Sequence, residues 1–205
     1  MNVADVTTIG RYDEFPFGLS WVIDEPMART SHAVADAGRV WLIDPVDAGD
    51  ALERARELGQ PAAVFQLLDR HNRDCAAIAQ RLGVPHVALP DELPQTPFEV
   101  VRVVDRRVWR ERALWWPAQR ALVVAEALGT SPLFTGGSGA VGVHLLLRLT
   151  PPRRLGRYRP DHLLVGHGAG VHGPSTGPAI DEALGRSYRD LPKVLAKLPF
   201  ALRDR

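Results

Sequence analysis

The turn DRHNRD at residues 69–74 places acidic, basic and imidazole side chains next to one another, directly before a predicted helix. Histidine and carboxylate groups in a turn can hold a metal ion, and a helix N-terminus also favours anions. The turn can equally be only a helix start, with Asn72 as the N-cap and Asp74 as an acid that complements the helix dipole. That interpretation explains neither His71 nor Asp69, so both are candidates for chemistry.

Glu126 and His167 are two further candidates at strand ends. Glu126 interrupts the otherwise apolar segment 121–128, where a buried carboxylate needs hydrogen-bond donors, a cation or a metal. The alternative is a strand that ends at Ala125, with Glu126 in solvent. His167 lies between two glycines after the apolar part of segment 161–168. Those glycines permit a sharp turn at a strand end, where active sites of α/β sheets gather; the alternative is a turn histidine that hydrogen-bonds locally.

The segments that must position these side chains alternate between apolar strands and amphipathic helices. In the first half, the pattern predicts strands at 39–44, 62–68 and 86–90, and helices at 47–59 and 75–83 that each end at a glycine. The middle of the chain predicts a meander of strands at 98–105, 113–117 and 121–128. A loop at 129–142, a strand at 161–168, and helices at 178–189 and from Leu191 follow. The order predicts an α/β fold, and the apolar run 143–150 has no firm assignment.

Composition excludes several classes of protein. The 205 residues fit one domain, and 45% hydrophobic with 24% charged residues are typical of a globular chain. The net charge of +1 does not favour nucleic acid or a membrane surface as a partner. The single cysteine, Cys75, excludes an intramolecular disulfide and a cysteine-rich zinc site. Without a basic and apolar leader or an apolar run of about 18 residues, we expect a cytoplasmic protein.

Three other patterns carry little functional information. GSGAVG at 137–142 lacks the preceding strand of a dinucleotide site, and GPSTG at 173–177 follows a loop where a nucleophile elbow requires a strand. The pair Trp115–Trp116 is explained better by a packed strand than by base stacking. If that pair is exposed, it or the amphipathic helix from Leu191 can bury a homodimer interface. The alternative for the helix is docking on the domain core.

Three segments, taken in order, resemble the metallo-β-lactamase fold. They are VFQLLDRHNRDCAAIAQRLGVPHVALP, ALWWPAQRALVVAEAL and RPDHLLVGHGAGVHG. The resemblance covers about residues 30–185, and it implies a single domain over residues 1–205 with a helical tail at 186–205. It implies an α/β fold of four layers, an αββα sandwich, with a site at one edge between the two sheets. Active members of the family hold a binuclear zinc, iron or manganese site, usually for hydrolysis.

The resemblance also implies candidate metal ligands. Glu126 stands where the family has its bridging Asp, and His167 stands where it has its last His ligand. His71 aligns with the final His of the family pattern HxHxDH, whose other ligand positions hold Gln66, Leu68 and Arg70. A register slipped by a few residues recruits Asp69 or Asp74 instead. The segment VVDRRVWRERAL, where the family has its middle His ligand, contains no histidine.

The first of two open hypotheses is a degenerate metal site, because this chain has one histidine in a turn where the family has three. The protein then holds no cofactor, is not a hydrolase, and acts as a binding or structural protein whose partner is a small molecule or an anion. Arg70 and Arg73 are the candidate anion contacts. A guanidinium paired with Glu126 or Asp69 would replace the charge of the lost metal.

The second hypothesis is a site for one ion of zinc, iron or manganese held by His71, Glu126 and His167. Two histidines and one carboxylate are a known ligand set for iron and zinc. Such an ion polarises a carbonyl or phosphoryl oxygen and activates water, with Asp69 or Asp74 as general base. The reaction is then hydrolysis of an ester, thioester or phosphoester.

Overall fold

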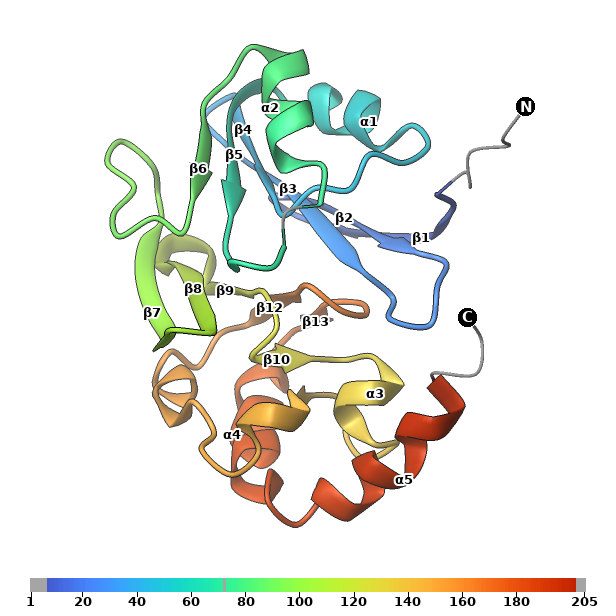
Figure 1. Ribbon diagram of the computed structural model, residues 1–205. Helices are drawn as coiled ribbons and strands as arrows, with labels where there is room; N and C mark the ends of the chain where they lie inside the picture. The colour runs from blue at the N-terminus through green and yellow to red at the C-terminus, as the bar shows by residue number, and fades with distance from the viewer. Residues whose placement is uncertain (1–6, 72, 202–205) are drawn as a thin grey trace, which may run out of the picture.

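Two large β-sheets pack against each other in the computed structural model, which describes residues 7–71 and 73–201 (Figure 1). The first sheet runs in chain order through β1 Ile9–Phe15, β2 Gly18–Ile23, β3 Thr30–Asp36, β4 Arg39–Ile43, β5 Gln60–Gln66 and β6 His86–Ala88. The second sheet has the order β13 Val171–His172, β12 His162–Val165, β9 Ala121–Val124, β8 Trp109–Trp116 and β7 Glu99–Arg106. A short separate pair consists of β10 Leu128–Gly129 and β11 Gly142–Val143.

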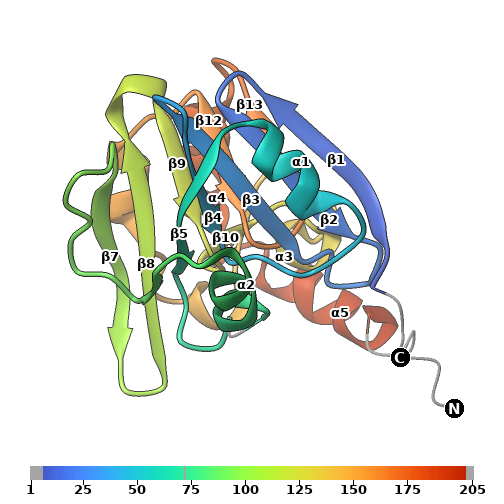
Figure 2. The same cartoon turned by 90° about the horizontal axis from the view of Figure 1, so that it is seen from above.

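Helices cover the outer faces of both sheets. Figure 2 shows α1 Ala51–Glu57 and α2 Cys75–Leu82 lying across the first sheet. Helix α4 Thr176–Arg186 lies beyond the second sheet, and α3 Pro132–Thr135 packs against α5 Leu191–Ala201 beside it (Figure 1). The four layers confirm the predicted α/β fold, an αββα sandwich. Among the described residues, no helix is long and apolar enough to cross a membrane.

Strand β4 shows why the central strands are apolar throughout. Trp41 and Ile43 pack in the core between the two sheets, whereas Val40 and Leu42 pack in the second core, beneath α1 and α2. Successive side chains of a strand point to opposite faces, so a strand covered on both faces needs apolar residues at every position. The same two-sided burial explains the apolar segment that becomes β5.

The second sheet contains the predicted meander, in which β7 pairs antiparallel with β8, and β8 with β9. Within it, the expectation of an exposed tryptophan pair is wrong. Trp116 is buried and packs edge-on against Phe17 and Phe98. Trp115 lies against Tyr158, with ring centroids 5.2 Å apart. The pair therefore belongs to the packed sheet, with Trp116 buried and Trp115 partly buried.

Several element boundaries differ from the sequence prediction. The strand predicted at 121–128 ends at Val124, and the chain pairs again only at β10. The predicted loop 129–142 contains α3, and the unassigned run 143–150 contains a 3₁₀ helix at Leu145–Leu147. Strands β1, β2 and β3 were not predicted, because β1 leaves several side chains exposed and the apolar residues of β2 are mixed with small ones.

Helix ends follow the predicted signals in part. Gly83 ends α2 in the left-handed conformation, with φ of 66°. The N-cap of α2 is Asp74, and the predicted cap, Asn72, lies outside the described residues. In α5, Val194 is buried against the domain while Leu195 is 48% exposed. Helix α5 therefore docks through part of its apolar face.

Candidate metal centre

His71, Glu126 and His167 converge at one edge between the two sheets. One ligand atom from each lies within 4.8 Å of the others. Nε2 of His71 is 3.2 Å and Nε2 of His167 is 3.5 Å from Oε1 of Glu126. The chain positions them from three separate places: the turn after β5, the break between β9 and β10, and the turn after β12. The three residues that sequence reasoning singled out thus form one cluster.

Both histidine rings are fixed by a hydrogen bond from Nδ1. His71 Nδ1 lies 3.1 Å from Oδ2 of Asp44, and His167 Nδ1 lies 2.9 Å from the carbonyl oxygen of Met27. A carbonyl oxygen only accepts, so Nδ1 of His167 carries a proton and Nε2 is the atom turned to the cluster. That Nε2 atom is buried and lies 3.5 Å from Oε1 of Glu126. Metal-ligating histidines in proteins are held in this way, with Nδ1 on a carboxylate or carbonyl.

The charges in the cluster suit a carboxylate ligand. Burial alone raises the pKa of Glu126, but the rings of His167 and His71 outweigh burial and lower this pKa well below its usual range. Glu126 is therefore ionised at neutral pH. For His71, burial and Arg73 lower the pKa, yet the carboxylates of Asp44 and Glu126 together outweigh both and raise it. A metal ion at Nε2 of His71 therefore has to compete with a proton.

The two arginines of the turn have different surroundings. Arg70 is 42% exposed in its side chain, donates to Oε2 of Glu126 at 2.9 Å, and lies 4.3 Å above the ring of Trp109. The terminal nitrogens of Arg73 are engaged instead with backbone carbonyl oxygens, those of Thr30, Asp44 and Gly166. Of the two predicted anion contacts, Arg70 is the one whose guanidinium reaches solvent beside the cluster.

The two candidate general bases make backbone contacts outside the cluster. Oδ2 of Asp69 accepts from the N–H of Arg110 at 3.0 Å. Oδ2 of Asp74 accepts from the N–H of Asp47 at 2.8 Å. The group of potential metal ligands found among residues 7–71 and 73–201 contains neither acid. Their role as general base stays a prediction.

His144 is a site residue that sequence reasoning missed. Its Nε2 lies 4.0 Å from Oε2 of Glu126, and its Nδ1 accepts from the N–H of Leu146. The proton is therefore on Nε2, which faces the cluster as a donor. Burial lowers the pKa of His144 to about 4, so the ring is neutral at pH 7. Nothing in the apolar run 143–150 marks this residue, because the packing of its ring on Trp109 and Phe134, both distant in the sequence, brings it to the site.

Glu111 is a second residue that sequence reasoning missed, and it shapes the backbone at Glu126. Its Oε1 accepts from the N–H groups of Glu126 and Ala127, at 2.9 and 2.8 Å. Its Oε2 accepts from Nε1 of Trp109 at 3.0 Å, and the side chain is fully buried. The carboxylate takes the backbone donors that a strand neighbour would otherwise pair, which explains why β9 stops before Glu126. The signal available in the sequence was the charge of Glu111 at a strand position that faces the interior.

Two packed sheets with helices on both outer faces, and a histidine and carboxylate cluster at their shared edge, define a protein of the metallo-β-lactamase fold. Two crystal structures of the DIM-1 metallo-β-lactamase are similar to this chain. The one exposed to ceftazidime has a TM-score of 0.58 and 11% sequence identity, and the match covers 90% of this chain and 100% of that chain. The other has a TM-score of 0.59 and 12% identity, over 87% and 97%. No protein-family model matches the sequence, and no curated protein does.

Proposed function

We propose that the protein is a single-metal hydrolase of the metallo-β-lactamase fold, in which His71, Glu126 and His167 hold one ion of zinc, iron or manganese. The observation that carries this proposal is the convergence of the three side chains: one ligand atom of each lies within 4.8 Å of the others, and Nδ1 of His167 is held by Met27. A cation bound among them would stabilise the largely buried carboxylate of Glu126, which needs a cationic or hydrogen-bonding partner. Two histidines and one carboxylate leave further positions open for water and substrate.

The side chains around the cluster support a hydrolytic role. A divalent ion bound there supplies Lewis acidity and a water of lowered pKa. His144 offers an N–H at Nε2 to an oxygen of the substrate, and Arg70 offers a cation at the solvent side. These donors suit the developing negative charge of an ester, thioester or phosphoester under attack. Asp44 holds the His71 ring in place during the reaction.

A two-metal site has too few ligands in this chain. At the positions where the family has further ligands, Leu68 is fully buried and Gln66 donates its amide to the carbonyl oxygen of Leu68 at 3.0 Å. Arg70 stands at the remaining position and brings a positive charge. Leucine offers no ligand atom, and a guanidinium repels a second cation. The proposal is therefore restricted to one ion.

A second candidate function is a metal-free binding protein, and the Arg70–Glu126 ion pair of 2.9 Å favours it. The guanidinium neutralises Glu126 without a metal, and its exposed face can contact an anion. The protein then keeps the fold and binds a small anionic molecule without hydrolysing it.

Metal analysis separates the two functions. Protein purified without chelator is expected to carry about one ion per chain, and both His71→Ala and His167→Ala are expected to lose it because each removes one of only three ligands. His162→Ala, which changes a histidine outside the cluster, is expected to keep the ion. Elemental analysis measures the content, and hydrolysis of p-nitrophenyl ester, thioester and phosphoester substrates measures activity. A wild-type chain that stays free of metal after incubation with excess zinc, iron and manganese supports the second function and overturns the first.

Asp44→Asn is expected to weaken metal binding by roughly 10–100-fold. An asparagine that keeps its oxygen on the N–H of Leu67 presents its NH₂ to His71, so Nδ1 becomes the acceptor and the proton moves to Nε2, the proposed ligand atom. Competition with a chromogenic zinc chelator measures the affinity. Asp47→Asn, on an exposed acid paired with Arg81, is the matched control and should bind like wild type. Equal affinities in Asp44→Asn and Asp47→Asn would contradict the assigned role of Asp44.

A further inference from the structure

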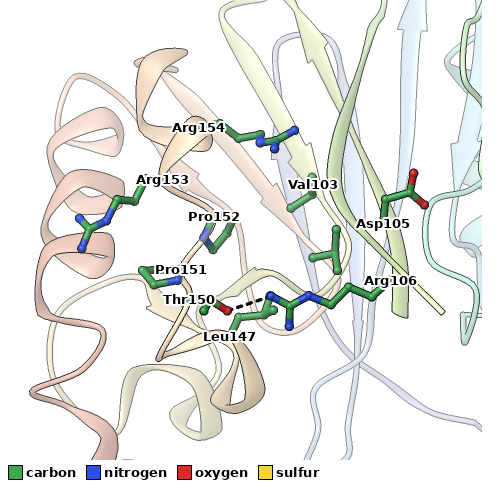
Figure 3. A pocket seen from close by; sticks show the side chains of 10 residues that line it. Val103, Asp105, Arg106, Leu147, Thr150, Pro151, Pro152, Arg153 and Arg154 are labelled. Atoms are coloured by element: carbon green, nitrogen blue, oxygen red, sulfur yellow. Dashed lines mark hydrogen bonds between the residues drawn. The ribbon is translucent and has the colours of Figure 1, made fainter. Parts of the chain in front are cut away.

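A cavity lies apart from the metal centre, between the edge strand β7 and the chain segment 147–154 (Figure 3). Its volume is about 510 Å³, within the range of small-molecule pockets. Val103, Leu147 and the neighbouring prolines Pro151 and Pro152 form apolar walls. None of the three proposed metal ligands lines this cavity. It is therefore a separate candidate site.

The cavity carries an uncompensated positive charge. Arg106, Arg153 and Arg154 line it, and no carboxylate among the described residues lies within ion-pair distance of any of them. The acid in the lining, Asp105, is directed instead to Arg112, at 3.9 Å. All three arginines are exposed, so their charges reach the solvent at the mouth of the cavity and can attract an anion there.

Two of these arginines are held across the opening. Arg106 extends from β7 toward the opposite wall and donates to Oγ1 of Thr150 at 3.1 Å (Figure 3). Arg154 extends in the other direction and donates to the carbonyl oxygen of Arg102, in β7, at 2.6 Å. Each guanidinium has five N–H donors and uses one in these contacts. The remaining donors are available to a ligand between the two groups, whereas Arg153 points away from the opening in Figure 3.

We propose that this cavity binds a phosphorylated small molecule, with Arg106 and Arg154 on its phosphate oxygens and the apolar walls against its carbon skeleton. A guanidinium pairs with phosphate through two parallel N–H donors, and two such groups facing one space favour a ligand with more than one negative charge. The two arginines are exposed, and the apolar residues between them form the floor on which the carbon skeleton of the ligand rests. The proposal is independent of the metal centre.

Calorimetric titration with pyrophosphate tests this site. The His167→Ala background removes the proposed metal site as a second place for the anion, and binding is expected to persist there. Arg106→Gln with Arg154→Gln is expected to weaken binding at least about tenfold. Arg107→Gln with Arg110→Gln removes the same charge from the neighbouring hairpin and is expected to change binding by less than about twofold. Thr150→Asp, which places a carboxylate beside Arg106, is expected to weaken binding like the double variant and needs no loss of an arginine.

Four results would overturn the proposal. The first is no saturable binding of pyrophosphate to the wild-type chain. The second is an equal loss in the two double variants, which indicates attraction to net charge alone. The third is tighter binding of malonate than of pyrophosphate, which assigns the cavity to dicarboxylates. Loss of binding in the His167→Ala background alone would likewise move the anion to the metal centre and leave this cavity without a ligand.

Discussion

Replacing Arg73 by methionine is expected to lower the free energy of unfolding by about 3–5 kcal/mol. The guanidinium of Arg73 donates at 2.6 Å to the carbonyl oxygen of Thr30 in the first sheet, and at 3.0 Å to that of Gly166 beyond the second sheet. It also donates to the carbonyl oxygen of Asp44 at 2.8 Å. Methionine retains the apolar stem but leaves these carbonyl oxygens without their charged donor, and it leaves His71 as the remaining cationic partner of Asp44. Urea unfolding followed by tryptophan fluorescence measures the change.

Arg70→Met is the matched control for Arg73→Met, because it removes the same side chain three positions earlier in the same turn. The ion pair of Arg70 with Glu126 is partly exposed, and such pairs contribute about 1 kcal/mol or less. We therefore expect Arg70→Met to remain within about 1 kcal/mol of wild type. An Arg73→Met variant as stable as Arg70→Met would show that Arg73 does not tie the two sheets together.

Glu111→Ala is expected to lower the free energy of unfolding by about 3 kcal/mol and to weaken metal binding as well. The substitution removes the acceptor for the backbone N–H groups of Glu126 and Ala127 and for Nε1 of Trp109. Three buried donors then lack a partner, and the backbone that carries the proposed ligand Glu126 loses its anchor. Thermal unfolding and the zinc competition assay together measure both effects.

Two variants make the Glu111 prediction specific. Glu99→Ala removes the same side chain from an exposed position of β7 and should change stability by less than about 0.5 kcal/mol. Glu111→Gln keeps an oxygen for the N–H groups of Glu126 and Ala127, so it should restore metal affinity. A Glu111→Ala chain with unchanged stability and affinity would refute the positioning role.

The pH dependence of the Glu111 contribution has a definite sign. Burial, opposed by the backbone N–H groups beside it, raises the pKa of Glu111 from 4.5 to about 7. The folded chain therefore binds a proton that the unfolded chain releases above about pH 4.5, and this part of the stability is lost as pH rises toward about 7. As pH rises from about 4.5 to about 7, the free energy of unfolding of Glu111→Gln should therefore increase relative to that of wild type.

Part of the fold could be predicted from the sequence because its signals are local. The apolar runs that become β4 and β5 follow from burial on two faces, and Gly83 ends α2 because a left-handed turn suits glycine. Where the signal depends on distant partners, the prediction was incomplete. The strand predicted at 121–128 stops at Val124, since the next backbone donors bond to Glu111 from the neighbouring strand.

From the sequence, the pattern of strands and helices predicted an α/β fold, and residue type at strand ends indicated the three candidate ligands. The metallo-β-lactamase fold followed from the resemblance of three ordered segments to that family. Only the tertiary structure decided that His71, Glu126 and His167 meet within 4.8 Å, and that the rings are held by Asp44 and Met27. A hydrogen bond between residues far apart in the chain depends on how the sheets pack, and neither residue type nor periodicity records it. The turn at 69–74 is therefore both a helix start and the place from which one histidine reaches the site.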